Sequence, residues 1–141
     1  MIQDVRIEIR GTQTADGEKN EVSFTTRGRF GMKDGEFFLS YDESEATGLE
    51  NARTTLFLRS DSSVVMQRTG LFQSRLVIEK GKRHVSPYST PYGEMQIGVL
   101  GESVEHRFTE EGGTLFMCYT LDSDSRPLSR NTVKISVRRG S

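Results

Sequence analysis

The sequence has few of the residues that build covalent or metal frameworks. Its 141 residues include one cysteine, two histidines and no tryptophan. The single cysteine, Cys118, excludes an intramolecular disulfide and a metal cage of several thiolates. The two histidines, His84 and His106, would need carboxylate help to hold zinc. We therefore predict no metal site and no cofactor, and we interpret Cys118 as a structural thiol because no basic partner is visible for it.

Long hydrophobic runs are also missing. The longest apolar stretch is Leu115–Tyr119, whereas a membrane-spanning helix needs ~20 such residues. The first residues, Met1–Arg6, do not show the basic region followed by an apolar region that marks a secretory signal. These features predict a protein without a membrane partner, and the lone cysteine favours a cytoplasmic location.

Neither sign of charge is in excess. Lysine and arginine total 19, aspartate and glutamate total 20, and the net charge is -1. Dedicated nucleic-acid binders normally carry a basic excess, so we predict no nucleic-acid partner. The length is typical of one domain, which we expect to span residues 1–141. The sequence does not decide between a monomer and a homodimer.

What the chain does have is alternation of apolar and polar residues with a period of two. Val5, Ile7 and Ile9 alternate with charged residues, as expected for a strand with one buried face. The same pattern recurs to the end of the chain, and no window of eleven residues shows the apolar stripe of a helix. The sequence therefore predicts an all-β protein.

Turn signals separate the predicted strands. Asp34-Gly35 marks a tight hairpin, and similar signals lie at 79–82 and 110–113. Longer loops are predicted at 12–20, 42–50 and 122–127, a turn at Gly101-Glu102, and an edge or bend around Pro87 and Pro91. Short turns favour up-and-down order. We predict a single antiparallel, mostly up-and-down β-barrel of about eight to ten strands, with a sandwich as the alternative.

Polar residues on the apolar faces are the candidate functional residues. Strand parity places Tyr41 and Glu43 on the face of Phe37 and Leu39, and it turns Arg68 inward, where it could neutralise Glu43. Parity also places Thr54 on the inward face, but we do not count Thr54 among the candidate ligand-binding residues. The candidate ligand-binding residues are Tyr41, Glu43, Arg68, His106, Tyr119 and Asn131. Each has a structural alternative: an internal ion pair for Glu43 and Arg68, and hydrogen-bonded core residues for the tyrosines and His106.

No catalytic motif is present. The sequence has no Gly-x-Gly-x-x-Gly turn, no Walker-type lysine and no Gly-x-Ser-x-Gly elbow. We therefore predict that the protein is not an enzyme, although pairs of carboxylates that meet only in the fold are invisible at this level. The acidic run 42–50 is interpreted as a solvated loop, with a weak calcium site as the alternative.

Several short segments together resemble a known family. They are Leu39–Glu43, Val65–Gly70, Tyr88–Met95, Gly113, Tyr119 and Ser129–Val133. Their order and spacing resemble the YwiB-like family of bacterial proteins over nearly the whole chain. The resemblance implies a calycin-like β-barrel, related in shape to lipocalins, fatty-acid-binding proteins and streptavidin. It implies no activity and no catalytic residues, because the function of that family is unknown.

Two hypotheses for the function follow. The first is a barrel that binds a small ligand with a polar or anionic head and an apolar body, because Arg68 and two tyrosines are expected inside. The second is an interaction or assembly module, because Phe57 and Phe116 are expected on the outer face. An enzyme would need a cleft in which Glu43 or His106 has a strongly perturbed pKa.

Overall fold

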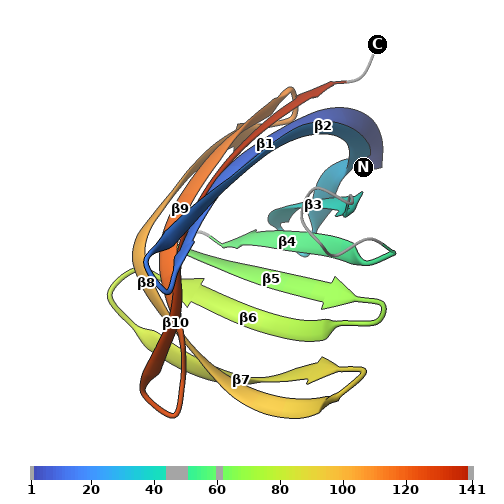
Figure 1. Ribbon diagram of the computed structural model, residues 1–141. Helices are drawn as coiled ribbons and strands as arrows, with labels where there is room; N and C mark the ends of the chain where they lie inside the picture. The colour runs from blue at the N-terminus through green and yellow to red at the C-terminus, as the bar shows by residue number, and fades with distance from the viewer. Residues whose placement is uncertain (1, 44–50, 60–61, 140–141) are drawn as a thin grey trace.

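The structure is a computed structural model that describes residues 2–43, 51–59 and 62–139. Ten strands form one closed antiparallel barrel, in which each strand pairs with its neighbours in the chain and β1 closes the ring by pairing with β10 (Figure 1). The strands are β1 (Ile2–Ala15), β2 (Glu18–Lys33), β3 (Glu36–Asp42), β4 (Arg53–Arg59), β5 (Ser63–Thr69), β6 (Gln73–Glu79), β7 (Arg83–Thr90), β8 (Gly93–Thr109), β9 (Gly112–Ser123) and β10 (Arg126–Arg139). The predicted all-β, up-and-down barrel is confirmed.

Tight turns connect the strands. Asp16-Gly17 and Asp34-Gly35 both have two consecutive positive φ angles, which match the right-handed twist of the flanking strands. The loop predicted at 12–20 was wrong, because β1 and β2 remain paired up to Ala15 and Glu18. The loop predicted at 122–127 was wrong for the same reason, since β9 and β10 continue almost to the turn. Both segments are polar on both faces, so they lack the alternation of apolar and polar residues from which the strands were predicted.

Strand β8 corrects a further prediction. The turn expected at Gly101-Glu102 is a β-bulge inside one long strand, because the pairing with β9 continues on both sides with a register shift between Gly101 and Ser103. A bulge bends the strand without ending it. Pro87 lies inside β7 rather than at a bend, and β6 and β7 share only two paired positions. Proline cannot donate to a sheet ladder, which fits its place at this weak seam.

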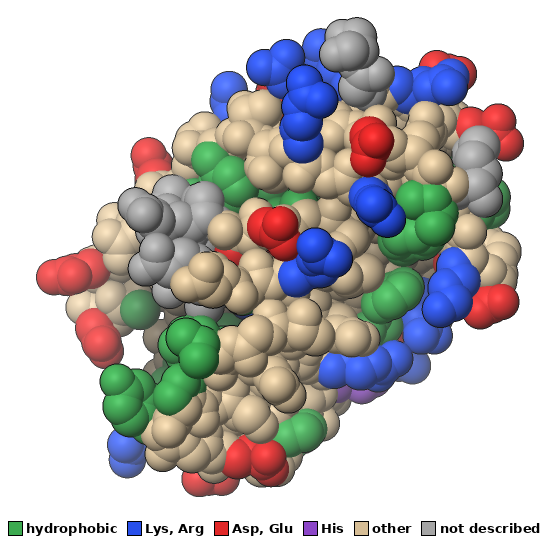
Figure 2. All heavy atoms as spheres, turned by 90° about the vertical axis from the view of Figure 1, so that its right-hand side faces the viewer, with side chains coloured by type: hydrophobic (Ala, Val, Ile, Leu, Met, Phe, Trp, Pro, Cys, Tyr) green, Lys and Arg blue, Asp and Glu red, His purple; other side chains and the backbone are tan. Residues whose placement is uncertain are grey.

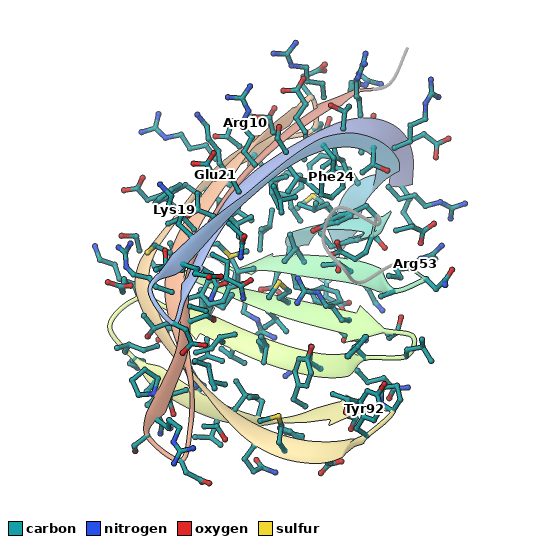
Figure 3. All side chains as sticks on the ribbon, in the orientation of Figure 1. Arg10, Lys19, Glu21, Phe24, Arg53 and Tyr92 are labelled. Carbon is teal, nitrogen blue, oxygen red and sulfur yellow. The ribbon has the colours of Figure 1, made fainter. Side chains whose placement is uncertain are left out.

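The barrel interior is apolar along most of its length. At one end, Phe30 stacks on Phe37 with ring centroids 5.3 Å apart, and Phe108 lies 5.6 Å from Phe30. Figure 3 shows Phe24 pointing into the barrel, whereas Arg10 points away from its outer surface. The described part of the chain contains no helix that could cross a membrane.

Gly28 sets the close contact between β2 and β3 beneath the candidate site. It pairs with Tyr41, and a Cβ atom at this position would lie 2.3 Å from the Ser40 carbonyl oxygen and 2.6 Å from a methyl carbon of Ile7. A backbone oxygen held in a sheet cannot move aside. We therefore expect Gly28→Ala to lower the free energy of unfolding by about 1–3 kcal/mol. Urea denaturation measures this change, and an unchanged midpoint would contradict the contact.

Candidate functional site

The phenylalanine cluster (Phe30, Phe37 and Phe108) fills one end of the barrel. The barrel contains a cavity of about 470 Å³ on the side away from this cluster. Its body is lined by aliphatic and methionine side chains, among them Leu56, Met66 and Met117. Exposed residues such as Gln13 and Leu128 also line it, so it opens to solvent between strand ends. Of the six candidate residues, five line this cavity: Tyr41, Glu43, Arg68, Tyr119 and Asn131.

Glu43 and Arg68 line the cavity and form its polar centre, and the fully buried Thr54 contacts both of them. The Thr54 hydroxyl donates to Oε1 of Glu43 at 2.5 Å and accepts from Nε of Arg68 at 3.3 Å. Nε of Arg68 lies 3.7 Å from the same carboxylate oxygen. The Glu43 side chain is 2% exposed and that of Arg68 is 19% exposed. The ion pair predicted from strand parity is therefore present, and Thr54 joins its two members.

Strand register explains why these three residues meet. Tyr41 pairs with Thr54 across β3 and β4, and Thr54 pairs with Arg68 across β4 and β5. Glu43 extends this row because its backbone N–H donates to the carbonyl oxygen of Ala52 at 2.9 Å. Paired side chains on one face lie about 4.5–5.5 Å apart at Cβ. Parity had placed Thr54 inside, but only the register shows that it stands between the two charges.

Arg68 has side-chain donors that no described residue accepts from. Both of its contacts involve Nε, so the two terminal nitrogens have no hydrogen-bond partner among the described residues. A guanidinium carries five N–H donors, of which four belong to those terminal nitrogens. Ser74 pairs with Arg68 across β5 and β6, and its hydroxyl, although buried, is without a partner in the described part of the chain. Polar groups in such surroundings are normally hydrogen-bonded, so Arg68, which lines the cavity, can bind an acceptor there.

Tyr41 and Tyr119 provide two buried hydroxyl groups beside the ion pair. Both lie on the cavity wall and are only 6% and 5% exposed. Burial raises the pKa of the Tyr41 hydroxyl well above its ordinary range, and the charge of Glu43 adds to this shift. Burial also raises the pKa of Tyr119, partly opposed by the charge of Arg68. Both side chains therefore remain neutral and can donate or accept hydrogen bonds.

These shifts predict the response of the barrel to alkali. A phenol whose pKa is higher in the folded state contributes stability that is complete below its ordinary pKa near 10 and is lost as pH rises beyond it. We therefore expect the free energy of unfolding to fall above about pH 10, and we expect Tyr41 and Tyr119 to ionise only at higher pH or on unfolding. Absorbance of tyrosinate during a pH titration measures this, with Tyr41→Phe and Tyr119→Phe to assign the late steps. Ionisation of both groups in the folded barrel near pH 10 would contradict their burial.

Asn131 lies on another wall of the cavity. It pairs with Tyr119 across β10 and β9, and its amide donates to the Ser129 hydroxyl at 3.0 Å. Ser129 also lines the cavity, directly after the irregular pairing that separates it from Pro127. Ser129 stands two residues before Asn131 and therefore on the same face, but sequence reasoning began the final strand at Asn131 and so missed it. Asn131 and Ser129 add a pair of hydrogen-bonding side chains to this wall of the cavity.

His106 does not join the cavity. It is half-buried near the phenylalanine cluster, where its Nε2 lies 2.8 Å from the carbonyl oxygen of Arg59 and its ring 6.4 Å from that of Phe108. Arg59 pairs with Ser63 at the start of β5, whereas Arg68 is five residues further along, or ~17 Å away at the rise of a strand. Its predicted place among the ligand-binding residues is therefore wrong, and its alternative as a hydrogen-bonded residue fits the geometry.

Cys118 and the acidic residues form no recognisable chemical centre. Cys118 is buried, and burial followed by its contact with Glu102 raises the pKa of its thiol. Such a thiol is a poor nucleophile. Within the described residues, no three histidine, cysteine, aspartate or glutamate side chains come together as they would around a metal ion. Of the acidic run predicted as a loop or a weak calcium site, residues 44–50 lie outside the described residues.

Comparison with known proteins identifies the family. The sequence pattern of a family described as a domain of unknown function, DUF1934, matches residues 7–135. The chain belongs to this family. This match covers nearly the whole barrel.

A relative in Bacillus subtilis (strain 168) confirms the YwiB-like resemblance. It is described as the uncharacterized beta-barrel protein YwiB and is 21% identical over 117 residues, which cover 83% of this chain and 80% of YwiB. The crystal structure of ywiB protein from Bacillus subtilis matches with a TM-score of 0.86 at 18% identity, over 99% of this chain and 94% of that one. This likeness shows the fold alone, so the use of the cavity must be argued from its geometry.

Proposed function

We propose that the barrel binds a small amphiphilic molecule, with its polar or anionic head group at Arg68 and its apolar body along the cavity wall. The observation that carries this proposal is the cavity of about 470 Å³ with Arg68 on its wall, whose terminal nitrogens have no partner within residues 2–43, 51–59 and 62–139. Ligand cavities in proteins commonly measure about 300–1,000 Å³ and combine apolar walls with a few polar groups. This cavity has both features.

The charges beside the cavity favour an acceptor as the head group. Glu43 and Arg68 already form a pair, so a cationic head would meet a carboxylate that is engaged by Thr54 and Arg68. A carboxylate, phosphate, carbonyl or hydroxyl head would instead accept from the terminal nitrogens of Arg68 and from the hydroxyls of Tyr41 and Tyr119. Charge-assisted bonds to an anionic head are the stronger ones. The proposed role is binding rather than catalysis, and a carrier or sensor needs no further group.

A series of amphiphiles with one tail and four heads tests this proposal. Decanoate, decyl phosphate, decanol and decyltrimethylammonium are each added below their micelle-forming concentration, and the midpoint of thermal unfolding is recorded. We expect decanoate and decyl phosphate to raise the midpoint most, decanol less and the ammonium compound least. A ligand at a hundred times its dissociation constant stabilises by ~2.7 kcal/mol. Equal shifts for all four, or none, would contradict a head-group site at Arg68.

An assembly module is the second proposal, and one feature of the outer face favours it. An outward cross-strand row of apolar residues runs from Phe38 through Phe57 and Val65 to Val77; Val65 is 1% exposed and the other three are half-buried. Phe57 is less exposed than predicted, because its ring lies 6.5 Å from that of Phe38, whereas Phe116 is 38% exposed as expected. Sedimentation equilibrium measures the mass in solution. A protein that is monomeric at all concentrations, as is its Phe57→Glu variant, does not assemble through this row. That result would contradict the second proposal.

We also propose that the protein works in the cytoplasm. Its only cysteine is buried and free, which suits a reducing compartment. Fractionation of the cells that make it, with a periplasmic and a cytoplasmic marker protein, tests this location. Recovery with the periplasmic marker would contradict it.

A further inference from the structure

The outer face of the barrel carries a row of arginines at one position of the sheet. Arg6 on β1 pairs directly with Arg27 on β2 and with Arg138 on β10. All three side chains are exposed. Neighbouring strands are about 4.8 Å apart, so three guanidinium groups start within roughly 10 Å of one another.

This arginine row (Arg6, Arg27 and Arg138) is not neutralised by any carboxylate in the described part of the chain. Among the described residues, none of its members lies within ion-pair distance of a carboxylate, although other surface arginines do, as in the pair of Arg139 with Glu111 at 3.3 Å. Like charges placed directly opposite each other across a sheet destabilise it. A row that keeps this repulsion in a protein of net charge -1 is therefore unusual.

The arginine row also lines a hollow on the surface. A depression of about 560 Å³ is bounded by all three arginines, with shorter side chains such as Thr25 and Ser136 beside them. Thr25 and Ser136 pair with Glu8, which stands in the next outward position of β1. Two acidic residues, Asp4 and Glu8, line the hollow against the three arginines of the row, and the charge of the fourth lining arginine, Arg139, is offset by Glu111. The local charge is therefore positive.

We propose that this hollow binds a short linear chain of phosphate groups, as in an oligophosphate or the phosphate tail of a nucleotide. Guanidinium groups match phosphate oxygens with pairs of parallel N–H donors. One phosphate can accept from only part of the arginine row, whereas three linked phosphates can engage each arginine in turn. Hydroxyl groups of Thr25 and Ser136 can donate to the same oxygens. The site is separate from the interior cavity and independent of its proposed ligand.

A compact oligophosphate fits better than a nucleic-acid strand. The row spans three adjacent strands and not the length of the barrel, so it offers few contacts to an extended polymer. Binding to nucleic acid draws on many phosphate contacts and a basic excess, which this chain does not have.

Titration calorimetry at low salt with tripolyphosphate tests this proposal. We expect tripolyphosphate to bind more tightly than inorganic phosphate. Each lost charge-assisted contact corresponds to about a tenfold loss of affinity, so Arg6→Gln/Arg27→Gln/Arg138→Gln should weaken binding by roughly a hundredfold or more. The matched control is Arg75→Gln/Lys80→Gln/Arg126→Gln, which removes the same charge from exposed positions outside the hollow and should change affinity less than about threefold.

Four outcomes would overturn the proposal. They are equal losses in the row variant and the control, equal affinity for tripolyphosphate and inorganic phosphate, and tighter binding of a single-stranded oligonucleotide that depends on the same row. The fourth is loss of tripolyphosphate binding in Arg68→Leu with the row intact, which would place the anion inside the barrel. The row residues are exposed on paired strands and the substitution removes like-charge repulsion, so the thermal midpoint of the row variant should be at least as high as that of the control, and this is recorded first.

Discussion

Replacing Arg68 with leucine should destabilise the barrel more than any other single change in the cavity. The carboxylate of Glu43, 2% exposed, would lose the one ionic partner that it has among the described residues and keep its hydrogen bond from Thr54. Removing one member of a buried ion pair costs about 3–5 kcal/mol. Because Arg68 itself is partly exposed, we expect about 3 kcal/mol, measured by urea denaturation at neutral pH.

The double substitution separates this effect from lost packing. Glu43→Leu leaves the arginine able to reach water in the cavity, so its cost should be smaller than that of Arg68→Leu. Glu43→Leu/Arg68→Leu removes both charges, and apolar replacement of a whole buried pair is often close to neutral. We therefore expect the double variant to be more stable than Arg68→Leu alone. A double variant whose loss equals the sum of the two single losses would show that the pair is not coupled.

Filling the cavity should abolish ligand binding without unfolding the protein. Leu121 is half-buried on β9 and lines the cavity, so a tryptophan there would occupy the space for the apolar body. We expect Leu121→Trp to weaken binding of decanoate by about a hundredfold, the equivalent of roughly 2.7 kcal/mol. Isothermal titration of decanoate into both proteins measures this.

The matched control places the same side chain outside the barrel. Leu100 is 39% exposed on β8, and Leu100→Trp adds the same indole where no cavity exists. It should bind decanoate as the unaltered protein does. Equal affinity of both tryptophan variants would show that decanoate does not use the cavity.

The sequence predicted the interior of the barrel better than its ends. Val5, Ile7 and Ile9 carry one face of β1, and a buried face leaves a period-two record in the sequence. The hairpin ends at Ala15 and Ser123 have polar residues on both sides, so only backbone pairing holds them in strands. The expected number of strands was right because two errors cancelled. The predicted turn at Gly101-Glu102 divided β8 into two strands, and the bend predicted at Pro87 left out β7.

The candidate site was predictable where the strands are regular. Tyr41, Arg68 and Tyr119 lie on well-paired strands, and parity turned each of them to the correct face. Parity gives the face of a residue but not its height along the barrel axis. His106 therefore shared the interior with Arg68 in the prediction, although it belongs to the phenylalanine cluster. Height depends on register, which bulges and turn lengths set together.

The most direct test of a ligand-binding interior is a crystal structure of the protein grown with decanoate. The account predicts density for the tail among Leu56, Met66 and Met117, with the carboxylate within hydrogen-bond distance of the terminal nitrogens of Arg68. Density for decanoate only on the outer surface, or a cavity filled by rearranged side chains, would contradict it.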